Sequence, residues 1–273
     1  MTESPAVAAG QATLEVNLVA GASAVTSVFA TSPMKLLTPV SRGQSVWACT
    51  SSFGGGLVAG DETRLEVTIG PGARCFLGTQ SSTKVYKNPA GHPCSHTTTA
   101  RLAPGALLVF APEPVQAFAE SRYVQRQEFH LAAGAGLVLL DWFTAGRTAC
   151  GERWAFAHFA SRNDVFFNGT RAVVDPILLA SAGVAERLGR FNCLATLLLI
   201  GAPFQPAAEA LLADIARRPV TRRAATVVSA SPLREGALLR LAGEEVESVR
   251  HEIQTQLAFL AKHLGDDPWS RKG

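Results

Sequence analysis

The stretch SFGGGLVAGDETRLEVTIGPGARCFLGTQSSTKVY, residues 52–86, decides the fold of this chain. Within it Leu65, Val67 and Ile69 alternate with polar neighbours, and this period of two predicts a half-buried strand. The segment Gly-Pro-Gly at residues 70–72 predicts a turn, and the apolar run from Cys75 predicts a second strand. The polar block at residues 79–84 lies between apolar residues, so its side chains must be paired or used in a function.

The unit of strand, glycine turn and buried strand recurs along the chain. The turns contain Gly72, Gly105 and Gly134, which are spaced at roughly 30 residues, a period typical of stacked repeat folds. Each unit is apolar on one face and needs a neighbour to cover that face. The repeat therefore favours a layered, β-helix-like body of stacked strands, and ordinary hairpins that share one kind of turn are the alternative.

The composition changes after Asp175-Pro176. Three Ala/Leu-rich segments separated by breakers, at residues 177–191, 194–201 and 207–217, predict short helices. Residues 223–230 and 238–241 return to a strand pattern, and residues 246–264 carry apolar positions at helical spacing. The expected fold class is mainly β with appended helices. We expect a loose tail at residues 1–10 and one domain at 11–273, with the β body at about 11–175 and a helix-rich second part at about 176–273.

Composition excludes several classes of protein. The 273 residues carry a net charge of only +3, and no basic stripe is present, which argues against nucleic acid as a partner. The longest apolar runs fall short of the about 18 residues that span a bilayer, which argues against a membrane. Five scattered cysteines and an N-terminus without a signal-peptide pattern predict reduced thiols and a cytoplasmic location.

The segment Ser81-Ser82-Thr83-Lys84 matches the S-x-x-K pattern of serine hydrolases, in which the serine lies one helical turn from the lysine. The companion tripeptides S-D-N and K-T-G are missing from the sequence, and the flanks predict strand or loop instead of helix. A serine-type hydrolase therefore stays an alternative, as does a β-repeat scaffold with no role in metal handling.

The segment GHPCSH places His92, Cys94 and His96 at alternate positions, and such side chains bind nickel and zinc. Pro89, Gly91 and Pro93 predict a loop here, so a surface loop with incidental ligands is the preferred interpretation.

Carboxylates next to the turns form a second group: Asp61, Glu113, Glu120, Asp141 and Glu152. A capping or ion-paired role is the plain interpretation of any one of them. As a group they gain weight, because a buried carboxylate is costly unless it meets a cation.

Three motifs in register, GGGLVAGD, GPGAR and TQSSTKVY, resemble the UreD (UreH) family of urease accessory proteins. The resemblance continues in APEPVQAF at 111–118, TAGRTACGERWAF at 144–156 and EGALLRLAG at 235–243. The residues that carry its motifs, and that it assigns to structure or interfaces, are Gly54, Gly55, Gly56, Thr79, Gln80, Thr83, Lys84, Tyr86, Gly146 and Arg147.

The resemblance implies a chaperone for nickel insertion that is not an enzyme. It implies binding to apo-urease and recruitment of the accessory protein UreF, which in turn docks the nickel-carrying GTPase UreG. It also implies a passage through the β body, with Ni²⁺ in transit and no tightly bound cofactor. Weak oxygen ligands suit such a passage, because tight Cys/His cages would trap the ion. We therefore expect Asp61, Glu113 and Glu152 to line the route, and the GHPCSH segment to matter little.

Overall fold

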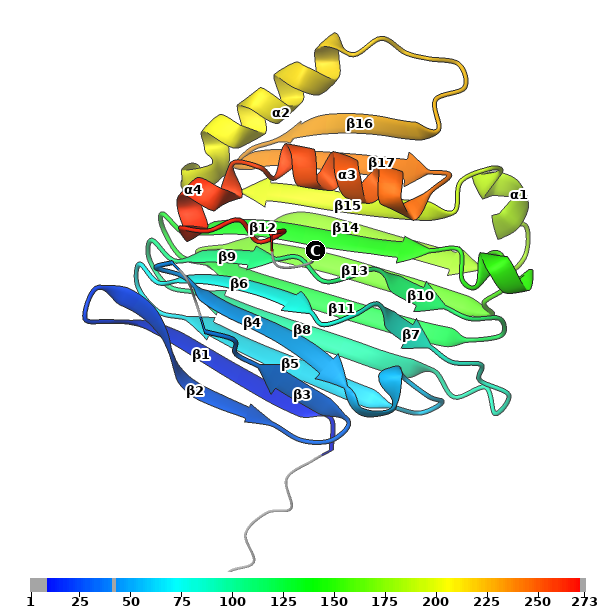
Figure 1. Cartoon of the computed structure of the whole chain (residues 1–273), viewed down its shortest axis with the longest axis horizontal. Coiled ribbons are helices and arrows are strands. Elements are labelled where there is room, and N and C mark those ends of the chain that lie inside the picture. Colours follow the sequence, from blue (N-terminus) through cyan, green and yellow to red (C-terminus); the bar gives the residue numbers. More distant parts are fainter. Residues whose placement is uncertain (1–8, 41–42, 271–273) are drawn as a thin grey trace, which may run out of the picture.

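Two stacked β-sheets form the body of the protein in the computed structural model, which describes residues 9–40 and 43–270 (Figure 1). Most of the expected loose tail, residues 1–8, lies outside the described residues. The small sheet has seven strands in the order β14 (Thr170–Ala180), β13 (His158–Phe167), β11 (Arg122–Leu131), β8 (Cys94–Leu102), β5 (Glu62–Ile69), β1 (Gln11–Val19) and β2 (Ala22–Ala30). The large sheet has ten: β16 (Thr226–Leu233), β17 (Gly236–Gly243), β15 (Cys193–Ile200), β12 (Gly136–Thr144), β9 (Leu107–Phe110), β6 (Arg74–Thr79), β4 (Val46–Ser52) and β3 (Met34–Leu37), with β10 (Val115–Ala117) and β7 (Thr83–Val85) beside them.

The central strands are parallel, and the chain passes from one sheet to the other through the repeated glycine turns. Gly72, Gly105 and Gly134 have φ of 67°, 70° and 71°, the left-handed region that favours glycine. The turns lie on top of one another, because a Cβ added to Gly105 would lie 3.9 Å from the Cα of Gly72. The amide of Gly72 donates to the carbonyl of Pro104 at 3.1 Å, and that of Gly105 to Ala133 at 3.2 Å. These contacts confirm the predicted stack of strand, turn and strand.

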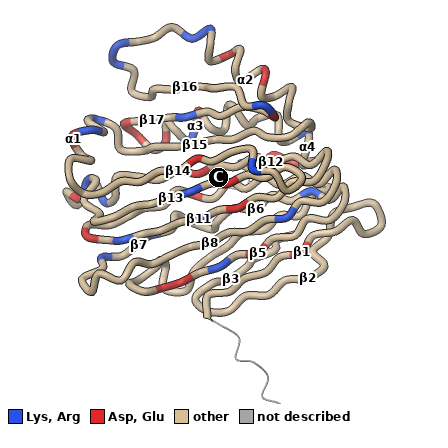
Figure 2. Tube along the Cα trace, turned by 180° about the vertical axis from the view of Figure 1, so that it is seen from behind, with Lys and Arg blue, Asp and Glu red and all other residues tan. Residues whose placement is uncertain are grey.

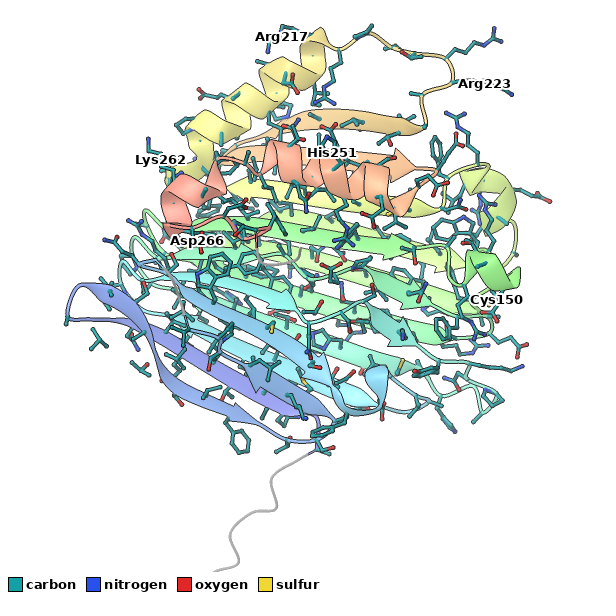
Figure 3. All side chains as sticks on the ribbon, in the orientation of Figure 1. Cys150, Arg217, Arg223, His251, Lys262 and Asp266 are labelled. Carbon is teal, nitrogen blue, oxygen red and sulfur yellow. The ribbon has the colours of Figure 1, made fainter. Side chains whose placement is uncertain are left out.

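Three helices cover the outer face of the large sheet (Figure 1): α2 (Gln205–Arg217), α3 (Val246–Gln256) and α4 (Leu260–Leu264). Apolar residues of this sheet and of the helices, including Leu199, Phe204 and Ile253, form one core cluster. No helix in residues 9–40 and 43–270 is long and apolar enough to cross a membrane. Arg217 at the end of α2 and Arg223 in the loop that follows point away from the body (Figure 3).

Two further apolar clusters fill the space between the sheets, one at each end of the strands. The cluster at the glycine-turn end contains Ile69 and Leu108, and the cluster at the opposite end contains Tyr123 and Phe159. The two clusters do not meet, and the side chains that separate them are polar.

Part of the predicted helical region is wrong. Strand β14 continues to Ala180, the helix α1 (Val184–Leu188) is short, and Cys193–Ile200 is strand β15. Strand β15 pairs with β12 and β17 and is covered on both faces. Its sequence is therefore continuously apolar and lacks the alternation that marks a half-buried strand. The helices at α2 and α3 are confirmed, although the last helical segment breaks between Gln256 and Leu260. The single-domain organisation stays a prediction.

Candidate functional site

A polar layer crosses the inner face of the small sheet between the two apolar clusters. Parallel pairing stacks equivalent positions of successive strands, so polar residues at two alternate positions become two rows. One row is Thr63, His96, Gln125 and Ser161, and the other is Thr98, Gln127, Asn163 and Asp175. All of them except His96, which is part-buried, are less than a tenth exposed. We call these residues, together with Asp141 of the large sheet, the polar layer.

Asp141 on β12 is the carboxylate at the centre of the polar layer. Its Oδ1 accepts a hydrogen bond from Gln125 Nε2 at 3.0 Å, and its Oδ2 accepts from Ser161 Oγ at 2.6 Å and from Asn163 Nδ2 at 2.9 Å. Burial raises the pKa of Asp141, and the three donors partly offset that effect. Among the residues that the structure describes, the carboxylate is therefore held by neutral donors, and no cationic side chain is hydrogen-bonded to it.

His96 extends the layer toward β5. Its ring nitrogens are hydrogen-bonded to Thr63 Oγ1 at 2.8 Å and to Thr98 Oγ1 at 3.1 Å. Burial lowers the pKa of His96 to about 4, so the imidazole is neutral near pH 7.

The loop expected across GHPCSH ends earlier than the sequence indicated. Strand β8 begins at Cys94, directly after the last breaker, Pro93, so Cys94 and His96 lie inside the sandwich and only His92 lies in the loop. Burial raises the pKa of Cys94 to about 12, which keeps it a thiol, and its Sγ donates to the carbonyl of Arg122 at 3.4 Å. The three side chains do not form a metal site, and no group of three or more His, Cys, Asp or Glu residues suited to a metal occurs in the described part of the chain.

A cavity of about 80 Å³ lies between the sheets beside the polar layer. That volume holds several water molecules, since one needs roughly 10–15 Å³. His96, Gln125, Gln127 and Asp141 line its inner part. The large sheet is interrupted between β6 and β7 and between β9 and β10, and the exposed Ser81 lines the cavity there. The cavity therefore opens through the gap in the large sheet.

Glu113 stands at this mouth. Its backbone amide donates to Thr79 Oγ1 at 2.8 Å, and its carboxylate pairs with Arg250 of α3 through contacts of 2.8 Å and 3.2 Å. The guanidinium of Arg250 lies 5.1 Å from the ring centroid of Trp142. The helix layer thus reaches the mouth of the cavity through one ion pair.

Comparison with known proteins supports the family resemblance that the sequence motifs indicate, and it extends over nearly the whole chain. Residues 8–272 match the family model described as "UreD urease accessory protein". The chain belongs to the UreD family of urease accessory proteins. It is 47% identical to the urease accessory protein UreD of Sorangium cellulosum over 97% of this chain and 84% of the relative. It is 41% identical to UreD of Anaeromyxobacter sp. over 96% and 89% of the two chains, and 33% identical to urease accessory protein D of Arabidopsis thaliana over 93% and 98%.

The glycine triplet of this UreD chain contacts the TKVY segment. A Cβ on Gly56 would lie 2.5 Å from the carbonyl oxygen of Lys84, so only glycine fits this approach. Gly54 and Gly55 have φ of 77° and 73°. The hydroxyl of Tyr86 donates to the carbonyl of Gly54 at 3.4 Å, which ties the two motifs together.

The remaining motif residues also hold loops in place. The amide of Gln80 donates to the carbonyl of Thr50 at 2.9 Å, and Thr83 lines the cavity. A Cβ on Gly146 would lie 2.8 Å from the carbonyl oxygen of Ala117, and Arg147 lies 4.3 Å from the ring centroid of Phe118.

Of the three carboxylates expected on the nickel route, the structure brings only Glu113 to the cavity. Asp61 Oδ2 accepts from the amide of Val58 at 2.8 Å and caps a turn. Glu152 pairs with Arg147, which is the main cause of its lowered pKa, and accepts from the amide of Ala119 at 3.1 Å. Their part in nickel transfer stays a prediction.

Asp141 is the functional candidate that the sequence analysis grouped with the other carboxylates and did not select. Its signal is a single charged residue inside the otherwise apolar segment LVLLDWF, residues 137–143. A charge at such a position is costly unless the fold provides partners, so it marks a polar interior. The S-x-x-K segment provides no such site, because Ser81 lies in a bend and Lys84 on β7 instead of on one helix.

Proposed function

We propose that this chain is a nickel-insertion chaperone for urease, and that Ni²⁺ crosses its body along the polar layer. It acts without catalysing a reaction, in the cytoplasm, by binding apo-urease and the accessory protein UreF, through which the GTPase UreG joins. Its place in the UreD family supports the role in urease maturation. The single observation that carries the nickel route is a cavity that leads from solvent to a buried carboxylate.

The chemistry of the polar layer suits a cation in passage. Amide, hydroxyl and carboxylate oxygens from Gln125, Ser161 and Asp141 are hard ligands that hold Ni²⁺ loosely. Asp141 is the carboxylate at the centre of the layer, a nearby cation favours its ionised form, and its neutral donors can turn away when a cation arrives. A buried carboxylate without a cationic partner is costly, and binding of a metal ion compensates its charge.

Glu113 supports the entry step in this proposal. Its carboxylate lies at the mouth, on the short stretch between Pro112 and Pro114 whose backbone is restricted by both rings. Because Arg250 holds this carboxylate, entry of a cation requires the pair to separate.

The test is Asp141→Asn, assayed with purified apo-urease, UreF, UreG and Ni²⁺. The amide keeps the shape of the side chain and removes its charge, so complex formation should persist while urease activity and the nickel content of urease fall at least tenfold. Glu128→Gln is the matched control, since Glu128 lies exposed on β11 between Gln125 and His130 and faces away from the layer. Glu113→Gln, Asp61→Asn and Glu152→Gln extend the series to the carboxylates predicted from sequence.

Normal activation by Asp141→Asn with an intact complex would overturn the nickel route and favour a scaffold without a metal role. Loss of the complex in that variant would instead show a structural role for Asp141, and Ser161→Ala then serves as the second variant, because it removes one donor and leaves the charge.

A further inference from the structure

The polar layer continues past the cavity to the opposite edge of the sandwich. In the small sheet Asn163 is in register with Asp175 of β14, the last strand. In the large sheet Asp141 is in register with Thr196, and Thr196 with Arg240 of β17. The two series end opposite each other, where the side chain of Arg240 forms an ion pair with Asp175.

This ion pair separates the polar interior from solvent. The side chain of Asp175 is 3% exposed and that of Arg240 is 56% exposed, so the guanidinium covers the carboxylate from outside. Oδ1 of Asp175 accepts from Arg240, whereas Oδ2 is buried and has no hydrogen-bond partner within residues 9–40 and 43–270. A buried carboxylate oxygen without a partner needs an explanation, and a bound cation or an ordered water molecule would supply one.

The surface around Arg240 is suited to a protein partner. The large sheet extends beyond β14, so that β17 and β16 form a step above the edge of the small sheet (Figures 1 and 2). Val227 of β16 is 45% exposed and lies on the same face of the large sheet as Arg240, whereas the exposed Val174 and Leu178 of β14 lie on the outer face of the small sheet, opposite to Asp175. An exposed apolar side chain beside a charged centre is compatible with a protein interface.

We propose that Arg240 is a latch on the far end of the polar layer, and that a carboxylate of the protein docking on this step opens it by pairing with Arg240. The proposal rests on the nickel route above. While the latch is closed, the guanidinium neutralises Asp175 and repels a second cation. Once a partner carboxylate takes Arg240, both oxygens of Asp175 are left buried and unpaired, and a Ni²⁺ ion arriving from Asp141 compensates that charge.

The occupant of the step is therefore the protein that accepts the cation, and it presents an exposed carboxylate to Arg240. A basic partner is disfavoured, because it would bring like charge against Arg240 and leave the latch closed. The alternative is that the ion pair between Arg240 and Asp175 only links the two sheets. In that case its removal changes the stability of the protein alone, whereas removal of a latch also changes the affinity of the isolated chain for a cation.

The experiment measures Ni²⁺ binding to the purified full chain by equilibrium dialysis, with no partner present. Arg240→Gln removes the latch, so the chain should bind Ni²⁺ at least tenfold more tightly than the wild type. The double variant Arg240→Gln with Asp175→Asn should lose that gain, because the carboxylate that attracts the ion is gone. Arg234→Gln is the control, since Arg234 lies between β16 and β17 with its side chain 95% exposed.

Unchanged Ni²⁺ affinity in Arg240→Gln, or a gain that persists in the double variant, overturns the latch. If Arg240→Gln does not fold, Arg240→Lys replaces it, for which a gain of about threefold is expected and no gain is the contrary result. The two proposals fail separately. Normal urease activation by Asp141→Asn refutes the nickel route, whereas impaired activation by Asp141→Asn with unchanged Ni²⁺ affinity of Arg240→Gln refutes the latch alone.

Reversing the charge of Arg240 and measuring the affinity for apo-urease gives a second test. Arg240→Glu should lower the affinity for apo-urease at least tenfold if apo-urease supplies the carboxylate, and the step is not its docking surface if binding is unchanged.

Discussion

Replacing His96 by glutamine should make the protein less sensitive to acid. In the folded chain the imidazole is enclosed with Thr63 and Thr98, and its pKa falls to about 4 from an ordinary value of 6.5. Between these two values the unfolded chain takes up a proton that the folded chain does not, so acid favours unfolding. The free energy of unfolding is therefore highest above pH 6.5 and falls as the pH drops toward 4.

The size of the effect follows from the shift. Each pKa unit corresponds to about 1.4 kcal/mol, so the wild type should lose about 3 kcal/mol between pH 7 and pH 4 through this group. Asp141 acts in the opposite direction, because its raised pKa lets the folded chain bind a proton more readily. Glu113 and Tyr123 are further titratable groups that line the cavity. Asp141, Glu113 and Tyr123 are present in both proteins, so their contributions to the unfolding free energy cancel in the difference between wild type and variant.

Urea unfolding at pH 7, 6, 5 and 4 provides the measurement, with His251→Gln on α3 as the control for an exposed histidine. The difference in unfolding free energy between His96→Gln and wild type should move by about 3 kcal/mol in favour of the variant as the pH falls from 7 to 4. Parallel pH dependence of the two proteins would refute the enclosed, neutral imidazole.

Three other predictions test the fold and the alternative function. Leu108→Ala removes a fully buried side chain between the sheets and should lower the free energy of unfolding by about 2–5 kcal/mol in urea, whereas a loss below about 1 kcal/mol would contradict its place in the core. Gly105→Ala should cost about 1–2 kcal/mol, measured in the same way, because φ is 70° while the nearest atoms leave room for a Cβ at 3.9 Å; no loss would mean that this turn is not left-handed. Ser81→Ala should leave urease activation unchanged, and its loss together with labelling of Ser81 by a serine-directed reagent would support the hydrolase instead.

The stacked body was predictable because its signal repeats within the sequence itself. Gly72, Gly105 and Gly134 each end an amphipathic strand, and a left-handed turn needs glycine every time, so the period is visible without any structure. The alternation in β5 likewise gave the buried face of that strand correctly.

The helix expected at residues 194–201 failed for a physical reason. A strand buried on both faces loses the period of two, and a short Leu-rich run fits a buried helix equally well. Only its pairing with β12 and β17, which are distant in the sequence, decides between the two.

The polar layer was hidden for a related reason. Gln125, Ser161 and Asp141 each look like isolated polar residues in a strand pattern, and only the register between strands brings them together. The sequence carried the right kind of residue, a carboxylate beside an apolar strand. It did not indicate which carboxylates were already occupied, as Asp61 is by an amide and Glu152 by Arg147.

Because the polar layer divides the interior into two separate apolar clusters, the side chains can rearrange along one plane while the main chain stays fixed. The backbone hydrogen bonds of the small sheet continue through this plane, and the clusters anchored by Ile69 and by Phe159 lie on either side of it. Rotation of Gln125 or Asn163 breaks hydrogen bonds between side chains only, and water can replace them. The polar layer can therefore take up water while the apolar clusters on either side of it stay packed.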